Sequence, residues 1–278
     1  MNDSDPRLVL AREGRASAWL QGVVPAGTYI EPSPLTPRLG WAALRRAPAP
    51  DAEQIDQLLF GERFGVLETA GGWCFGQAAR DGYVGWVEAA ALAHGPPAPT
   101  HRVARLTAAV FAEPDARAPA LAALPMNALV AVAAEERGFA KVAGGGWAPL
   151  AHLSPIGLFA TDPAAVAERW LGTPYVWGGR GGLGVDCSGL VQAALFACGR
   201  ACPRDSDQQA ALGAPVKAAE LARNDLVVWP GHIGLMLDAT RLVHASGVQM
   251  AVVIEPLARA VAARRATAGE PTAFRRLI

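Results

Sequence analysis

The sequence lacks several features that would assign it to a common class of protein. Its 25 basic and 25 acidic residues leave no net charge, and its Lys and Arg residues form only short pairs. Nucleic-acid-binding surfaces normally need an excess of positive charge, so we expect no nucleic acid partner. No apolar run could span a membrane, and the charged N-terminus leaves no room for the core of a signal peptide. We therefore expect a cytoplasmic protein with no membrane partner.

Cysteine is also scarce, with only four residues: Cys74, Cys187, Cys198 and Cys202. Without a secretory signal we expect these thiols to be reduced. Zinc sites usually combine two ligand pairs, and no histidine spacing matches the Cys198/Cys202 pair, so we expect no metal. The Gly-x-Ser-x-Gly motif is absent, which excludes the nucleophile elbow of many serine hydrolases.

Proline-rich segments divide the chain into three parts. The run GPPAP occupies residues 95–99, and the prolines at positions 155 and 163 flank a second break. Proline cannot donate to a sheet ladder and interrupts helices, so such segments are typical of linkers. We predict domains at residues 1–95, 96–155 and 156–278, the first with an N-terminal extension.

The first two parts carry the same pattern of short strands. In the first part, apolar segments between glycine turns predict strands at residues 64–68, 73–77 and 83–87. Weaker copies occur at residues 129–132, 139–142 and 146–150. The repeat predicts a duplicated small all-β barrel. The run DGYVGWV at residues 81–87 resembles the last strand of bacterial SH3-like domains.

The third part mixes helices with strands. Asp162-Pro163 can cap and open a helix that we expect to run through Trp170. A second apolar helix begins near Cys187 and stops at Gly199. Three consecutive antiparallel strands are then predicted, at residues 225–229, 232–237 and 241–246. This order indicates an α+β domain.

A single cysteine stands where the second helix begins, in the run VDCSGL at residues 185–190. A thiol in the first turn lies near the positive end of the helix dipole and near unpaired N–H groups, which favours the thiolate. Two histidines follow on predicted strands, His232 and His244. This order of cysteine and histidine is that of papain-like catalysis.

The two histidines can assist the cysteine only if both face its helix. Side chains alternate along a strand, so His232 and Gly234 share one face. If Leu237 lies opposite Arg241, then His244 lies opposite Gly234 and on the same face as His232. His232 can then take the thiol proton while His244 orients its ring. For either histidine alone, an ordinary hydrogen-bonded strand residue is the alternative.

The run GRGGLG at residues 179–184 matches the Gly-x-Gly-x-x-Gly fingerprint of dinucleotide sites. No βαβ unit with a second parallel strand follows it, so we reject a dinucleotide site. We expect instead a flexible loop whose backbone amides approach the substrate carbonyl near Cys187.

Four runs together resemble the NlpC-type family of cell-wall cysteine peptidases: PYVWGG (174–179), VDCSGLV (185–191), GHIG (231–234) and LVHAS (242–246). The resemblance covers residues 160–278 and implies a papain-like domain after the two SH3-like barrels. It implies that Cys187 is the nucleophile, His232 the base and His244 the third polar residue, with no cofactor. Relatives with two SH3-like domains resemble γ-D-glutamyl-L-diamino acid endopeptidases. These cleave murein stem peptides that carry a free N-terminal L-Ala, which implies a role in cell-wall recycling. We expect a monomer.

Binding a free ammonium group requires carboxylate and hydroxyl groups in a closed site. The resemblance implies that the substrate-binding residues are Glu62, Tyr83, Tyr175, Asp186, Ser188, Asp205 and Ser206. Structural alternatives remain for several of them. Asp186 could cap the helix, Tyr83 could belong to the barrel core, Glu62 could be a solvated turn residue, and Tyr175 could serve packing.

Two other classes of function stay open. The SH3-like repeats could bind peptidoglycan beside an inactive third domain, although Cys187, His232 and His244 argue against this. The same residues could also serve an amidase or an acyltransferase.

Overall fold

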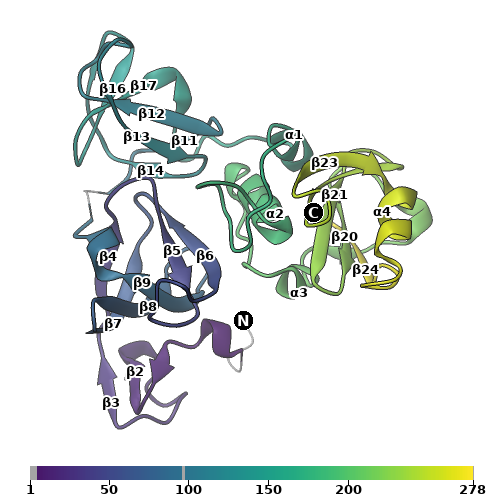
Figure 1. The fold of residues 1–278 in the computed structure, drawn as a ribbon, viewed down its shortest axis with the longest axis horizontal. Helices are drawn as coiled ribbons and strands as arrows, with labels where there is room; N and C mark the ends of the chain where they lie inside the picture. Colours follow the sequence, from purple (N-terminus) through teal and green to yellow (C-terminus); the bar gives the residue numbers. More distant parts are fainter. Residues whose placement is uncertain (1–4, 96–97, 278) are drawn as a thin grey trace. The chain divides into compact units, whose positions relative to one another are not determined.

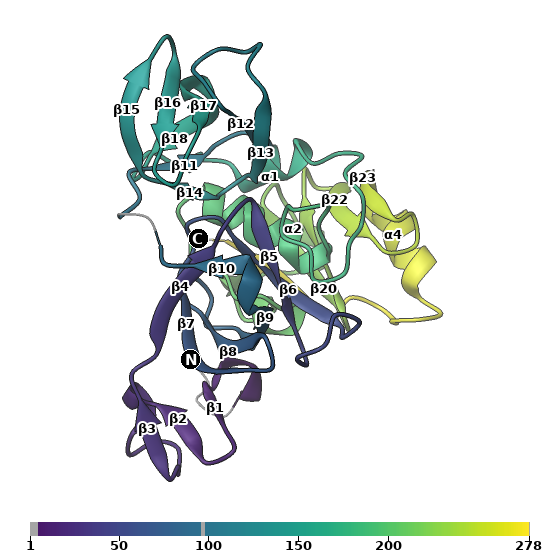
Figure 2. The ribbon, with the colours of Figure 1, turned by 60° about the vertical axis from the view of Figure 1, so that its left-hand side comes forward.

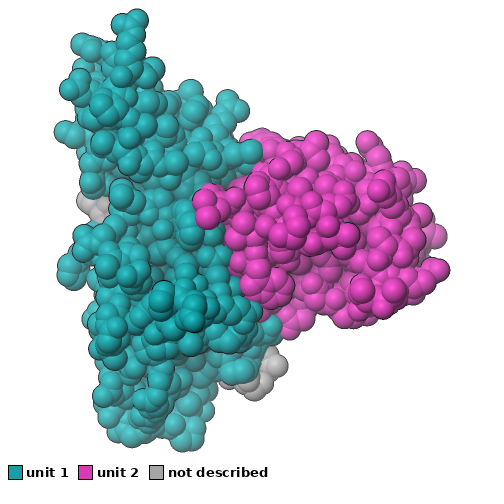
Figure 3. Space-filling model, viewed as in Figure 1, with its two compact units in different colours: residues 1–156 teal, residues 157–278 magenta. Residues whose placement is uncertain are grey.

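The computed structural model describes residues 5–95 and 98–277 (Figure 1). Pro96 and Pro97 of the predicted linker, and the first four residues, lie outside the described part. The chain forms two compact units, residues 1–156 and residues 157–278, coloured separately in Figure 3. In the described residues, no helix combines the length and the apolar character needed to cross a membrane.

Unit 1 begins with a small sheet and a first barrel. The sheet contains β1 (Ala11–Arg12), β2 (Arg15–Ser17) and β3 (Thr28–Ile30), with the 3-10 helices η1 (Pro6–Leu8) and η2 (Ala18–Leu20) beside it in sequence. The barrel contains β4 (Ser33–Pro37), β5 (Trp41–Arg45), β6 (Gln54–Leu59), β7 (Phe64–Ala70), β8 (Trp73–Ala78), β9 (Val84–Glu88), η3 (Ala89–Ala91) and β10 (Leu92–Ala93). Its strand order is β10-β4-β7-β8-β9-β5-β6.

A second barrel completes unit 1 and is labelled in Figure 2. Its elements are β11 (His101–Val103), β12 (Thr107–Phe111), β13 (Ala120–Pro125), β14 (Leu129–Val130), β15 (Val132–Glu136), β16 (Phe139–Val142), β17 (Trp147–Pro149), η4 (Leu150–His152) and β18 (Leu153–Pro155). The sheet order β13-β12-β17-β16-β15 repeats the order β6-β5-β9-β8-β7 of the first barrel. The predicted internal repeat is therefore confirmed by topology.

Unit 2 has the predicted α+β arrangement. Its helices are α1 (Pro163–Glu168), α2 (Cys187–Ala197), α3 (Ser206–Gln209), η5 (Ala218–Glu220) and α4 (Leu257–Arg264). Its strands are β19 (Ala214–Pro215), β20 (Asp225–Trp229), β21 (His232–Met236), β22 (Arg241–Ser246), β23 (Ala251–Pro256) and β24 (Ala273–Arg276). They form one antiparallel sheet in the order β19-β24-β20-β21-β22-β23. Figure 1 shows this sheet between α2 and α4.

The first helix of unit 2 is shorter than predicted. Asp162 caps it as expected, because its side chain accepts hydrogen bonds from the amides of Ala164 and Ala165. The helix ends at Glu168 instead of continuing through Trp170. The amides of Arg169 and Trp170 bond to carbonyls three residues earlier, so the last turn tightens and the α-helical pattern stops.

Candidate active site

The cysteine occupies the first position of α2. Asp186 caps this helix by accepting a hydrogen bond of 2.7 Å from the amide of Gly189. Gly189 is required by close packing, because a Cβ there would lie 2.0 Å from the carbonyl oxygen of Gly179. Gly199 then ends the helix with a φ of +72°. Local sequence therefore fixes both ends of α2 and places the Cys187 thiol at its N-terminus.

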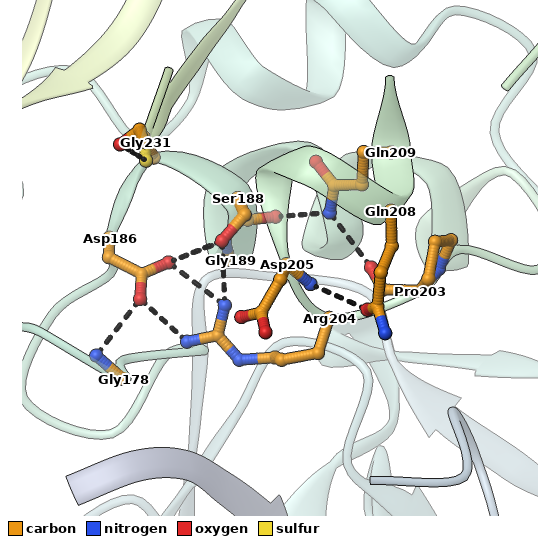
Figure 4. A network of polar contacts seen from close by, with 11 residues as sticks. Gly178, Asp186, Ser188, Gly189, Pro203, Arg204, Asp205, Gln208, Gln209 and Gly231 are labelled. Carbon is orange, nitrogen blue, oxygen red and sulfur yellow. Dashed lines mark hydrogen bonds and ion pairs between the residues drawn. The ribbon is translucent and has the colours of Figure 1, made fainter. Parts of the chain in front are cut away.

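Asp186 is the centre of a buried polar network, drawn in Figure 4. Arg204 forms two bonds with its carboxylate, of 2.6 and 3.1 Å, and Gly178 donates its amide at 2.9 Å. The hydroxyl of Ser188 donates to Asp186 at 3.2 Å and accepts from Arg204 at 2.9 Å. The capping role of Asp186 is confirmed. A role of Asp186 and Ser188 in substrate binding stays a prediction.

The segment that carries Asp205 and Ser206 is joined to the cysteine helix. Asp205 caps α3 in a capping box with Gln208, and Ser206, the first helical residue, is buried. Gln209 donates to the carbonyl oxygens of Ser188 and Pro203, at 3.0 and 2.8 Å. Figure 4 shows Gln209 bridging these two segments. Asp205 and Ser206 therefore lie on the segment that α2 holds in place.

The two histidines share one sheet face, as predicted. Leu235 pairs with Val243 and Met236 with Leu242, which puts Gly234 opposite His244. The Nε2 atom of His232 lies 2.9 Å from Nδ1 of His244. A Cβ on Gly234 would lie 3.1 Å from the Cβ of His244, so the glycine leaves space for the His244 side chain.

This shared face is not the one that packs on the cysteine helix, contrary to our expectation. Met236 and Leu242, which lie on the same face as the histidines, pack against Ala260 of α4. Cys187 lies instead at the end of the strand that begins with His232. Its sulfur lies 3.9 Å from the carbonyl oxygen of Gly231, the residue before His232. A nucleophile at the first helical position reaches the strand end without facing the sheet.

Sequence reasoning missed two charged residues around His244. Glu255 of β23 lies 2.8 Å from its Nε2 atom, and Arg264 of α4 lies 3.2 Å from its Nδ1 atom. A signal for Glu255 exists, since it is the only charged residue in the strand AVVIEP. Arg264 had none, because the sequence alone does not show which face of its helix is buried.

The electrostatics of the site differ from the expectation for a helix-start cysteine. Burial, followed by the Asp186 carboxylate, raises the pKa of the Cys187 thiol to about 12. Burial and the positive charge of Arg264 lower the pKa of His232 well below its usual value. Both groups are therefore neutral at pH 7. The helix dipole does not overcome burial and a neighbouring carboxylate.

Tyr175 lies in the same electrostatic environment. Burial raises its pKa, and the neighbouring Cys187 and Asp186 raise it further, so the phenol keeps its proton. The tyrosine is half-buried, and its amide donates to the carbonyl of Met250. Its electrostatic interaction with Cys187 places it near the thiol, while its role in substrate binding stays a prediction.

Backbone hydrogen bonds and close packing hold the glycine-rich loop at residues 179–184, while its expected flexibility stays a prediction. The amide of Gly181 bonds to the carbonyl of Gly184, and the amide of Asp186 bonds to that of Gly179. A Cβ on Gly184 would lie 2.3 Å from the carbonyl oxygen of Pro174. The loop is thus tied to the start of the cysteine helix.

Glu62 and Tyr83 lie in unit 1, and each is held inside the first barrel. Glu62 is 2% exposed, accepts from the amide of Leu59 at 3.0 Å and pairs with Arg80 at 2.8 Å. The alternative of a solvated turn residue is therefore wrong. Tyr83 belongs to the barrel core, which confirms its structural alternative. Their contribution to an amine pocket stays a prediction.

Three or more His, Cys, Asp or Glu side chains positioned for a metal ion were not found within residues 5–95 and 98–277.

The comparisons with known proteins find one matching domain family in each of the two compact units. Residues 44–92 match the bacterial dipeptidyl-peptidase Sh3 domain, and residues 172–269 match the NlpC/P60 family. The chain combines an SH3_16 domain with an NlpC/P60 domain. The NlpC/P60 match contains all three predicted catalytic residues.

Two curated relatives and one solved structure extend this result. Dipeptidyl-peptidase 6 of Lysinibacillus sphaericus is 38% identical over 91 residues, which are 32% of this chain and 33% of that protein. The γ-D-glutamyl-L-lysine dipeptidyl-peptidase of Bacillus subtilis is 27% identical over 68% of this chain and 71% of that protein. An NlpC/P60 family protein from Bacillus cereus has a TM-score of 0.75 at 20% identity, covering 88% of this chain and 99% of that one. The last match shows the papain-like NlpC/P60 fold.

The first curated matches span limited parts of their own proteins. The matched region covers 33% of the Lysinibacillus protein and 48% of a probable endopeptidase of Corynebacterium glutamicum.

The neutral resting pair predicts how the Cys187 thiol depends on pH. Because the pKa of His232 is lowered, its base form persists as pH falls below 6.5 and is lost only when the ring becomes protonated at a lower pH. Alkylation of Cys187 by iodoacetamide should therefore stay constant from pH 7.5 to 6.5 and fall only below that range. Mass mapping of the labelled peptide measures the rate.

The matched control is Cys198, at the other end of the same helix. His232→Ala should slow labelling of Cys187 and leave labelling of Cys198 unchanged. An acid limb centred at or above pH 6.5 contradicts the lowered pKa of His232. Equal labelling of both cysteines in the folded protein contradicts the assignment of His232 as the base.

Proposed function

We propose that the protein is a cysteine peptidase that hydrolyses the γ-D-glutamyl-L-diamino acid bond of murein stem peptides with a free N-terminal L-Ala. The observation that carries the proposal is a helix-start thiol that contacts Gly231, the residue before His232 of a buried histidine pair. The Cys187 sulfur lies 3.9 Å from the Gly231 carbonyl, and His232 is bonded to His244 at 2.9 Å. Relatives named dipeptidyl-peptidase 6 and γ-D-glutamyl-L-lysine dipeptidyl-peptidase support the substrate class.

The chemistry follows from the two neutral groups. His232 takes the Cys187 proton, and the thiolate attacks the γ-carbonyl carbon of the D-glutamyl residue. His232 then returns the proton to the departing amine of the diamino acid, which leaves a thioester on Cys187. Water attacks the thioester while His232 takes its proton, the C–S bond breaks to release L-Ala-γ-D-Glu, and His232 returns the proton to the sulfur to restore the thiol. A peptide with a free N-terminal L-Ala has already lost its glycan, so the proposed substrate is a product of cell-wall turnover.

The test compares two peptides that differ only at the N-terminus. The protein should cleave L-Ala-γ-D-Glu-diaminopimelate to L-Ala-γ-D-Glu and free diaminopimelate, as identified by mass. The N-acetylated peptide should be cleaved at least about tenfold more slowly, because acetylation removes a charge that can form strong hydrogen bonds. L-Ala-γ-D-Glu-L-Lys, tested in parallel, shows which diamino acid is preferred.

Three other outcomes contradict parts of the proposal. Equal cleavage of free and acetylated peptides removes the requirement for a free amine. Transfer of the dipeptide to an added amine in place of water indicates an acyltransferase. Binding to peptidoglycan without cleavage of either peptide indicates the non-catalytic scaffold.

A further inference from the structure

Charged groups hold both ring nitrogens of His244. Its Nε2 atom lies 2.8 Å from the carboxylate of Glu255, and its Nδ1 atom lies 3.2 Å from the guanidinium of Arg264 and 2.9 Å from His232. His244 has no exposed surface, and Glu255 and Arg264 are each 7% exposed. Because the ring is shielded from water, these neighbours determine which nitrogen carries the proton.

The strand register explains how both charges reach one ring. His244 pairs with Val253, so Glu255, two residues later, lies on the same sheet face and diagonal to the histidine. The chain then turns at Pro256 into α4, which covers this face and presents Arg264 at its last turn. A segment of ten residues thus supplies both groups.

The contacts of His244 with Glu255 and with Arg264 require the same tautomer of its ring. An ionised carboxylate only accepts hydrogen bonds, so Nε2 of His244 must carry a proton to donate to Glu255. A guanidinium only donates, so Nδ1 of His244 must be unprotonated to accept from Arg264. Burial and the charge of Arg264 also lower the pKa of His244 to about 4, which keeps the ring neutral at pH 7.

The proton position of His244 determines that of His232. An unprotonated Nδ1 on His244 can only accept, so Nε2 of His232 must donate to it across 2.9 Å. The neutral His232 ring then has its lone pair on Nδ1. We propose that Glu255 and Arg264 are positioning residues that fix the tautomers of His244 and His232, so that Nδ1 of His232 is the base for Cys187.

The same groups interact with the charges that form during the reaction, although Arg264 itself disfavours a positive charge on the His232 ring. When the Cys187 proton moves to Nδ1 of His232, the ring becomes positive and the sulfur negative. Glu255 faces the positive ring through the neutral His244, and Arg264 interacts electrostatically with the thiolate of Cys187. This step is a proton transfer and needs no oxidant, reductant or co-reactant.

The inference rests on the proposed peptidase mechanism, but its test does not use peptide cleavage. Long-range ¹⁵N–¹H NMR of the full chain labelled at histidine nitrogens distinguishes the tautomers, and iodoacetamide labelling at pH 7 measures how readily Cys187 ionises. In the wild-type protein, His232 and His244 should both show a protonated Nε2 and an unprotonated Nδ1. A protein that cleaves no peptide but gives these spectra would contradict the proposed function alone.

The variants test the cause of the tautomer. Glu255→Met removes the acceptor and should slow Cys187 labelling about tenfold, while Glu255→Gln, whose amide oxygen can still accept, should restore most of the rate. Combining Glu255→Met with Arg264→Met should slow labelling about a hundredfold and mix the tautomers, since both constraints are then lost.

Arg259 provides the matched control. It lies 3.5 Å from the other oxygen of Glu255 but is 74% exposed, so Arg259→Gln should change neither the spectra nor the labelling. A proton on Nδ1 of His232 in the wild-type spectrum overturns the proposal. So does a folded Glu255→Met/Arg264→Met protein with wild-type tautomers and labelling. If that double variant does not fold, Arg264→Met alone tests the cause, and the wild-type spectrum still decides the tautomer.

Discussion

Cys187→Ala is expected to lower kcat/KM for L-Ala-γ-D-Glu-diaminopimelate about 10⁴-fold or more, because no other group can form the thioester. His232→Ala should have a similar effect, since the neutral thiol then has no proton acceptor. His244→Ala should leave more residual activity, because an orienting group contributes less than the base it orients. Mass analysis of the released diamino acid measures all three rates.

The matched control for the nucleophile lies on the same helix. Cys198 caps the C-terminal end of α2, and Cys187 begins that helix. Cys198→Ala should therefore stay within about twofold of the wild-type rate, as is usual for a residue away from the reacting groups. Wild-type activity in Cys187→Ala would eliminate the covalent mechanism.

Sequence patterns predicted those parts of the site that depend on residues close together in the chain. Alternation and turn residues placed β20, β21 and β22, and the small-residue run before Leu190 placed the start of α2. The opposition of His244 to Gly234 followed from the short turn between two strands, because turn length sets register. The repeat of strand order in the two barrels followed from similar runs in the sequence.

The remaining features depend on contacts between distant segments. The pKa of Cys187 is raised because tertiary packing buries the thiol beside Asp186, and the helix dipole alone predicted the opposite direction. Arg204 and Arg264 reach their partners only after α3 and α4 have packed on α2 and the sheet. One alternative for Glu62 was a solvated turn residue. The residue pairs with Arg80 instead, and this pair forms only when the barrel closes. Periodicity gives no information on such pairings.

Arg204→Met is expected to destabilise the fold more than any of the other single substitutions. Arg204 is 1% exposed and forms a two-bond ion pair with Asp186, the cap of the cysteine helix. Its removal leaves a buried carboxylate without its cation, which typically costs about 3–5 kcal/mol. The unfolding transition should move down by roughly 10–20 °C in scanning calorimetry of the full chain.

The control for this effect is an arginine with exposed partners. Arg223 pairs with Asp162 and Glu168 at 2.8 and 2.9 Å, and its side chain is 38% exposed. Ion pairs in contact with solvent contribute about 1 kcal/mol or less, so Arg223→Met should move the transition by only a few degrees.

Adding Asp186→Asn to Arg204→Met distinguishes the lost ion pair from lost packing. Asparagine can still accept the Gly189 amide and cap the helix, but it carries no charge that needs compensation. If the buried charge causes the destabilisation, the double variant should be more stable than Arg204→Met alone, since removing both charges is less costly than leaving one unpaired. If the packing of the arginine side chain dominates, the second substitution should not recover stability. A cost below about 1 kcal/mol for Arg204→Met itself would show that the remaining donors, the amides of Gly178 and Gly189 and the hydroxyl of Ser188, are sufficient to hold Asp186 at the start of the helix.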